Sequence, residues 1–456
     1  MQRPAWALVA AALACMTPAA ARADEAADLA QIRQQIQQLK QEYEARIGAL
    51  EKRLATTEQQ AEQAQSAAKS VAQQQRGNAF NPPISMILQG RYASLSQDPA
   101  TYRIGGFIPS GGQVDPGKRG MSLTESELVF SATADPYFSG TLIASLAPDG
   151  GIDVENGYLE TNSLSDGWTL KAGRFFSKIG YQNEQHSHAW DFIDAPLPYR
   201  AFLGGQLADD GVQAKWVAPT DLLVELGAEA GRGRSFPGND RDKNGVALGT
   251  LFGHIGGDIG VSQSWRAGLS YLQTSPDARP YDDLDATGNN VTNAFTGRSK
   301  LWLADAVWKW APNGNPYYRN FKLQGEYFRR DESGTLVFDT PGVALPGTYS
   351  SSQSGWYGQA VYQFLPRWRV GLRYDRLDSG AVDIGQVDSG AMPASDFPIL
   401  APYTPTLATA MVDYSPSEFS RVRLQLARDK SRPDATDNQL FIQYILSLGT
   451  HGAHTW

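Results

Sequence analysis

Apolar and polar residues alternate with a period of two over most of the chain after Ile84. The segment 421–426 reads Arg-Val-Arg-Leu-Gln-Leu, and 368–375 reads Trp-Arg-Val-Gly-Leu-Arg-Tyr-Asp. Because successive side chains of a strand point to opposite faces, this pattern predicts strands with one apolar and one polar face. A soluble sandwich would show the same period with its apolar face turned inward.

We expect about sixteen strands of roughly ten residues, an even number that suits a closed antiparallel transmembrane barrel. The expected spans are 84–96, 121–134, 138–148, 151–163, 167–179, 206–216, 221–231, 247–262, 264–274, 298–311, 317–330, 354–365, 366–377, 405–415, 419–429 and 438–448.

The connections between these strands are alternately short and long. Short turns fall at 135–136, 219–221 and 312–314, among others. The long polar connections are 97–120, 180–205, 232–246, 275–297, 331–353 and 378–404. Short periplasmic turns and longer extracellular loops are typical of outer-membrane barrels. Aromatic residues such as Trp302, Trp356 and Trp368 lie near expected strand ends, where aromatic girdles meet the membrane interfaces. The apolar faces are therefore expected to contact the lipid of a bacterial outer membrane.

Residues 24–76 have a different, helical period. Leu29, Ile32, Ile36, Leu39 and Tyr43 follow one another at steps of three and four, which is the seam of a coiled coil. The other positions are mainly polar, so the stripe is too narrow for a helix in a soluble core. We expect an oligomeric coiled coil in the periplasm, able to contact peptidoglycan or another envelope partner; Ile at several seam positions is compatible with a trimer. The barrel domain then spans 77–456.

The first 23 residues have the order of a secretory signal peptide. A basic Arg3 precedes a short apolar stretch, and Ala21-Arg22-Ala23 gives the small-residue cleavage pattern. Cleavage there would remove Cys15, the single cysteine of the sequence, so the mature chain would have neither a disulfide nor a cysteine nucleophile.

Composition narrows the possible functions. After the signal peptide, no run of eighteen apolar residues follows, which excludes a helical membrane protein. The net charge of −8 gives no reason to expect nucleic acid as a partner. The sequence contains no Gly-x-Ser-x-Gly, phosphate-binding Gly-rich loop or His-Glu-x-x-His, so we do not expect an enzyme.

If the apolar faces contact lipid, the alternating charged residues face the lumen. The expected lumenal cations include Lys171, Lys215, Lys322, Arg330, Arg369, Arg373, Arg421 and Arg423. A wall with charges of one sign sets ion selectivity in a channel. The alternative is that these charges pair with carboxylates across neighbouring strands.

The segment 184–191 contains two of the five histidines, His186 and His188. In an extended backbone both point to one side, as two imidazole ligands of Zn²⁺ would, and Glu184 or Asp191 could add an oxygen ligand. The alternative is an ordinary polar loop, and no other cofactor is expected.

One stretch resembles the phosphate-selective porin O/P family. It consists of Ala172-Gly173-Arg174-Phe175-Phe176, Gly180, Asn183-Glu184, Phe192-Ile193-Asp194, Gly204-Gly205 and Asp210-Gly211-Val212. The likeness extends from Ile84 onward in architecture. It implies a sixteen-stranded trimeric channel for the passive diffusion of small anions, with an inward-folded loop that Arg174 and Lys178 approach. The alternative function is a zinc-related outer-membrane uptake or receptor protein that uses the histidine segment.

Overall fold

The computed structural model describes residues 37, 40, 84–111, 114–147 and 150–449. The predicted signal peptide lies outside the described residues, and so does most of the predicted coiled coil. Within 24–76 the structure describes Gln37 and Lys40, both helical and exposed. The described strands all belong to the unit Pro82–Trp456.

The strands occupy nearly all of this unit. They are β1 (Ile84–Leu95), β2 (Gly120–Leu123), β3 (Ser126–Thr133), β4 (Phe138–Leu146), β5 (Ile152–Thr161), β6 (Trp168–Phe176), β7 (Ala208–Val217), β8 (Leu223–Gly231), β9 (Leu248–Ile259), β10 (Gln263–Thr274), β11 (Arg279–Leu284), β12 (Asn290–Trp310), β13 (Asn320–Phe338), β14 (Leu345–Leu365), β15 (Trp368–Ile384), β16 (Thr406–Ser417), β17 (Ser420–Arg432) and β18 (Ala435–Leu448). Two short helices, α2 (Leu197–Leu203) and α3 (Gly385–Asp388), lie in connections.

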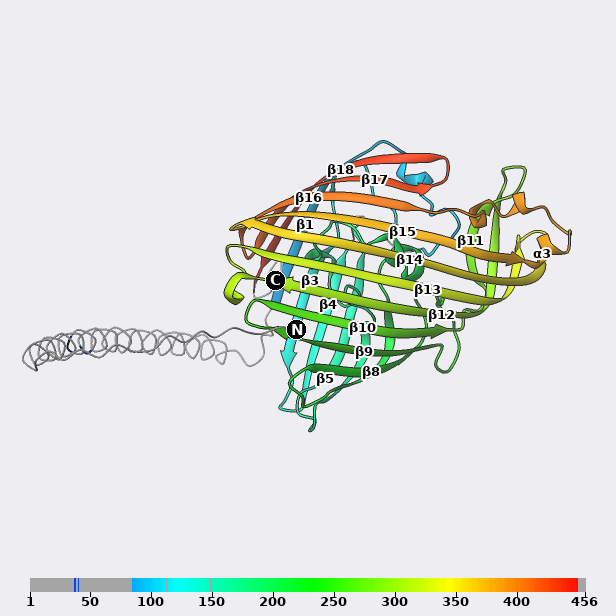
Figure 1. Cartoon of the computed structure of the whole chain (residues 1–456). Coiled ribbons are helices and arrows are strands. Elements are labelled where there is room, and N and C mark those ends of the chain that lie inside the picture. Colours follow the sequence, from blue (N-terminus) through cyan, green and yellow to red (C-terminus); the bar gives the residue numbers. More distant parts are fainter. Residues whose placement is uncertain (1–36, 38–39, 41–83, 112–113, 148–149, 450–456) are drawn as a thin grey trace, which may run out of the picture. The chain divides into compact units, whose positions relative to one another are not determined.

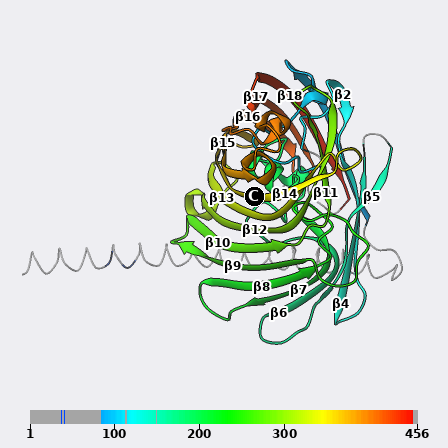
Figure 2. The ribbon, with the colours of Figure 1, turned by 90° about the vertical axis from the view of Figure 1, so that its right-hand side faces the viewer.

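The strands close into one antiparallel barrel (Figures 1 and 2). Apart from β2 and β11, the strands pair in sequence order, and β1 closes the ring against β18, with Met86 opposite Leu448 and Leu95 opposite Gln439. Both β2 and β3 pair with β1 and form one interrupted wall strand, while β11 pairs with β12 alone. The eighteen labelled strands of the described range therefore make a wall of sixteen, which confirms the predicted barrel.

Outward positions of the wall are apolar and inward positions are polar, the reverse of a soluble protein. On β15, Leu372 is 67% exposed whereas the next residue, Arg373, is 3% exposed. On β18, Ile442 is 45% exposed and Gln443 is 4% exposed. This distribution matches a wall that contacts lipid outside and encloses polar groups inside.

Strands β12, β13 and β14 are longer than predicted. β13 and β14 continue through the expected loop 331–353, where Ser333 opposes Ser350 and Thr335 opposes Thr348. β11 and β12 form a further hairpin within the expected loop 275–297. Beyond the lipid zone neither face of a strand needs apolar residues, so alternation no longer marks the strand although backbone pairing continues.

Two apolar clusters fill part of the barrel interior. One surrounds α2 and includes Phe202, Phe328 and Leu377. The other joins connections at the end with the longer loops, and includes Ile108, Phe295 and Phe397. Among the described residues, the structure has no helix that is long and apolar enough to cross a membrane.

Candidate functional site inside the barrel

The connection 177–207, between β6 and β7, folds into the barrel; we refer to it as the inner segment. Asn183, which is fully buried, holds its two ends together. The Asn183 side-chain amide donates to the carbonyls of Ser177 (2.7 Å) and Leu207 (2.9 Å), and its oxygen accepts from the backbone N–H of Leu207 (2.8 Å). Satisfying these buried backbone groups fixes the base of the segment.

α2 is the part of the inner segment that packs against apolar side chains. All seven of its residues are buried, and Tyr199 and Phe202 contact Phe328 of β13 with ring centroids 5.0 and 5.9 Å apart. The helix ends at Gly204, whose φ of 66° is the left-handed conformation that glycine adopts without strain.

Cationic side chains on one side of the lumen converge on the inner segment. We call them the basic wall, and they are Lys322 of β13, Arg369 and Arg373 of β15, and Arg421 and Arg423 of β17. Asp191 accepts from Arg369 (3.2 Å) and forms an ion pair with Lys322. The Trp190 carbonyl accepts from Arg421 (3.0 Å) and Arg423 (2.8 Å).

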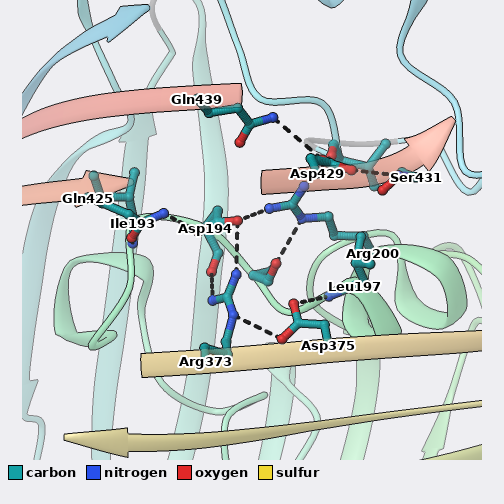
Figure 3. A network of polar contacts seen from close by, with 12 residues as sticks. Ile193, Asp194, Leu197, Arg200, Arg373, Asp375, Gln425, Asp429, Ser431 and Gln439 are labelled. Atoms are coloured by element: carbon teal, nitrogen blue, oxygen red, sulfur yellow. Dashed lines mark hydrogen bonds and ion pairs between the residues drawn. The ribbon is translucent and has the colours of Figure 1, made fainter. Parts of the chain in front are cut away.

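Asp194 makes the second contact with this wall, and Figure 3 shows it between two guanidinium groups. One of its carboxylate oxygens pairs with Arg373 (3.0 Å) and with Arg200 of α2, and the other accepts from Gln425 (2.8 Å). Asp375 on β15 accepts from the backbone N–H of Leu197 at the start of α2 (3.0 Å). The network thus holds both backbone and side chains of the inner segment.

On the other side of the lumen the inner segment meets the acidic wall, defined as Glu127 of β3, Glu155 of β5, and Glu225 and Glu229 of β8. The Nδ1 atom of His186 lies 3.2 Å from Glu155 and 3.4 Å from Glu127. His188 approaches the other oxygen of Glu127 at 2.9 Å.

The base of the segment meets the same wall. The backbone N–H of Lys178 donates to Glu229 (2.9 Å), and its ammonium lies 3.6 Å from Glu225. Lys178, His186 and His188 of the segment therefore face the acidic wall, whereas Asp191 and Asp194 face the basic wall.

The protonation of the segment follows from these partners. Burial lowers the pKa of His186, but the hydrogen bond and charge of Glu155 outweigh burial and raise it to about 9. Burial raises the pKa of Asp191 and Asp194, but the charges of Lys322 and Arg369 beside the first, and of Arg373 and Arg200 beside the second, bring both below the ordinary value. Both carboxylates are thus ionised at neutral pH.

The structure separates three of the predicted site cations, Arg174, Arg330 and Lys178, from the basic wall. Arg174 pairs with Asp210 of β7 (2.6 Å) and alternates with the buried Phe175, so it faces away from the lumen. Arg330 is buried nearer the loop end, where it donates to Gln353 (2.6 Å). Lys178 lies beside the acidic wall.

The four predicted metal ligands are not brought together. His186 and His188 stack with ring centroids 5.7 Å apart, but Glu184 pairs with Lys178 (2.8 Å) and Asp191 is held by the basic wall. Glu127, Glu155 and His186 instead offer ligand atoms within 4.8 Å of one another. His186 already hydrogen-bonds to Glu155 and forms an ion pair with Glu127, so the cluster is an ion-paired contact between wall and segment.

Asn183, Tyr199 and Arg200 were not predicted as site residues, although each orders the inner segment. The sequence does carry one signal for Tyr199 and Arg200, because the expected polar loop contains the mainly apolar run Leu197–Leu203. An apolar run inside a polar connection indicates a segment that is buried.

Comparison with known proteins identifies a relative and a fold. No protein-family model matches the sequence. The solved structure of OmpTdeltaL8, a loop L8 deletion mutant of an outer membrane protein of Vibrio cholerae, matches with a TM-score of 0.50 and 12% identity, over 81% of this chain and 99% of that one. An anion-selective porin from Comamonas acidovorans matches with a TM-score of 0.48 and 9% identity, over 81% and 99% of the two chains. At its identity the first likeness shows the fold alone, which is the porin-like barrel of an outer-membrane protein.

A sequence relative is closer. An uncharacterized protein of Aquifex aeolicus (strain VF5) is 31% identical over 406 residues, which cover 82% of this chain and 80% of the relative. The chain therefore belongs to the same protein family as this Aquifex aeolicus protein.

Proposed function

We propose that the protein is a porin-type channel of the bacterial outer membrane for passive diffusion of small anionic solutes, with the inner segment as its constriction. The polar interior and apolar exterior of the wall support a membrane channel. The loop-rich end would face outward, and the predicted coiled coil would lie in the periplasm. Assembly as a trimer belongs to the same proposal.

The observation that carries the anion preference is the set of groups that the basic wall already binds. Its arginines and Lys322 hold the carboxylates of Asp191 and Asp194 and the carbonyl of Trp190. Guanidinium groups recognise carboxylate and phosphate oxygens in the same two-pronged geometry. The wall therefore offers sites of the kind that a small oxyanion needs.

Positive charge is also in excess at this wall. With Arg200 included, six cations share four carboxylates, those of Asp191, Asp194, Asp375 and Asp413. Arg421 contacts the Trp190 carbonyl and forms none of the ion pairs among the described residues. A lumen wall with a net positive charge concentrates anions at the constriction.

An anionic solute would pass by exchange with these internal carboxylates. As the oxygens of the solute approach Lys322 and Arg369, Asp191 can release these two cations one at a time, so that each cation always has an anionic partner. Phosphate fits this chemistry as well as a carboxylate does, because both present several acceptor oxygens. The walls select by charge, and the inner segment limits size.

Conductance in planar bilayers tests the proposal. The refolded chain should give stepwise currents in KCl, with a reversal potential under a salt gradient that reports chloride preference. Arg369→Gln/Arg423→Gln should lower the chloride-to-potassium permeability ratio, whereas the matched control Arg298→Gln/Lys300→Gln, on exposed positions of β12, should leave it unchanged. A folded barrel that gives no current, or that prefers potassium, would refute the proposal.

A further inference from the structure

The outer face of the barrel carries a depression between β13 and β18, with a volume of about 690 Å³. Small and large apolar residues alternate across it. The register sets Ala360 opposite Leu372, Leu372 opposite Ala410, and Ala410 opposite Leu426. Because alanine fills less space than leucine, the small residues form the floor of the depression and the leucines its sides. Gly358 lies in the same floor.

Three cations adjoin this depression on the outer face. Arg428 lines it, and register sets Arg376 opposite Thr406 and Thr406 opposite Lys430. All three side chains are exposed, and within the described residues none forms a hydrogen bond or ion pair. Asp378, the next outward position after Arg376, accepts instead from the backbone N–H of Gly380 (2.9 Å).

The cations lie at the level where headgroups meet the barrel. Trp356, which lies opposite Arg376, packs against Tyr374 with the ring centroids 5.7 Å apart, and both side chains are exposed. Exposed aromatic residues of this kind mark the membrane interface. An uncompensated cation on the lipid face is costly at the bilayer midplane but tolerated near the interface. Unpaired cations above an apolar depression match a molecule with a negatively charged head and an apolar tail.

We infer that the outer face of β14–β17 binds a lipid with a phosphorylated, negatively charged headgroup. An acyl chain lies in the depression over Gly358, Ala360 and Ala410, and the headgroup contacts Arg376, Arg428 and Lys430. A second copy of the chain would have to bring carboxylates to three cations, whereas the outward faces of the strands are mainly apolar. The inference rests on the outer-membrane placement and not on conduction.

Native mass spectrometry of the full-length protein in detergent tests this site. Phosphatidylglycerol should bind as a discrete adduct, and phosphatidylcholine with the same acyl chains should bind more weakly. Each basic residue near a membrane surface changes binding about fivefold, so Arg376→Gln/Arg428→Gln/Lys430→Gln should lower the affinity for phosphatidylglycerol by roughly a hundredfold. The matched control is Arg298→Gln/Lys300→Gln, at exposed positions of β12 away from the depression.

A second variant tests the acyl-chain seat separately. A Cβ added at Gly358 meets only the Trp356 side chain, at 4.0 Å, so Gly358→Leu/Ala410→Leu should fill the depression without disturbing the wall. It should weaken phosphatidylglycerol binding with all three cations present. Heat-modifiable migration on a gel verifies that each variant is folded.

The site would be overturned if the two lipids bound equally well, or if the β12 control lost as much phosphatidylglycerol affinity as the charge variant. Full competition by inorganic phosphate at the same concentration as the lipid would also overturn it. So would a change of oligomeric mass in the variants with lipid binding intact. The last would assign this face to a second copy of the chain. Conductance of the charge variant is expected to stay normal, so failure of the channel proposal remains distinguishable.

Discussion

The inner segment is held by two walls of different chemistry. On the basic wall, Asp191 and Asp194 meet guanidinium groups, which stay charged at any physiological pH. On the acidic wall, His186 meets Glu127 and Glu155, and this imidazolium loses its charge as the pH rises through its pKa of about 9. The contact with the basic wall therefore stays charged at physiological pH, whereas the contact with the acidic wall depends on pH. A rise in pH should release the part of the segment near the histidines.

The largest effect is expected from Asp194→Ala. This change leaves the buried guanidinium groups of Arg373 and Arg200 without their shared carboxylate. Removing one partner of a buried ion pair costs about 3–5 kcal/mol, so the inner segment should open more readily by that amount. Hydrogen exchange of peptides from 190–205 measures this opening free energy. The control is Asp277→Ala, which breaks an ion pair with Lys243 in which both side chains are a third or more exposed. Because an exposed ion pair contributes little, this control should change the exchange of the peptides around Asp277 very little. Unchanged exchange in Asp194→Ala would show that this wall does not hold the segment.

Asn183→Ala should have the next largest effect and should act on both walls alike. It removes three hydrogen bonds that join the ends of the segment, and their loss leaves buried backbone groups unpaired, at a cost of about 2–3 kcal/mol. Exchange should rise across the whole of 177–207. Asn239 offers a matched control because its side chain clamps both backbone groups of Asp277 in another loop. Asn239→Ala should therefore loosen that loop alone, and a rise confined to one wall in Asn183→Ala would contradict the common role.

The pH dependence should separate the walls. Because the pKa of His186 is about 9 when docked and 6.5 ordinarily, its contribution is complete below pH 6.5 and is lost as pH rises through 9. For Asp191 and Asp194 the docked pKa lies below the ordinary 3.8, so their contribution is complete above that value and is lost only as the pH falls below it.

Between pH 7 and 9, we expect the opening free energy of 184–188 to fall by about 1–2 kcal/mol while that of 190–194 stays constant. Hydrogen exchange corrected for its intrinsic pH dependence measures both. In His186→Gln the difference between the two peptides should disappear. A fall of equal size in both peptides would mean that the walls do not act separately.

The wall and the inner segment differ in how far sequence could predict them. Strands were predictable because each must present an apolar face to lipid. The residue types of Leu372 and Arg373 alone therefore indicate which one faces outward and which one faces the lumen. The partners of the inner segment were not, because Asp194 lies 179 residues before Arg373 and 231 before Gln425 in the chain. No local pattern encodes such pairings. Sequence spacing placed Glu184 with the histidines as a metal ligand, whereas in the structure Glu184 forms an ion pair with Lys178.

Lys178→Gln should have the smallest effect, less than about 1 kcal/mol. The ammonium of Lys178 contacts Glu184 within the same segment at 2.8 Å, a bond that does not tie the segment to the wall, and its distance to Glu225 is 3.6 Å. The firmer contact at this position, from the backbone N–H to Glu229, survives the substitution. Glu229→Gln provides the contrast, since Glu229 also accepts from Ser177, Gln213 and Thr250. If Lys178→Gln raised exchange of 177–188 as much as Glu229→Gln did, the side chain of Lys178, rather than the backbone, would be the anchor at the acidic wall.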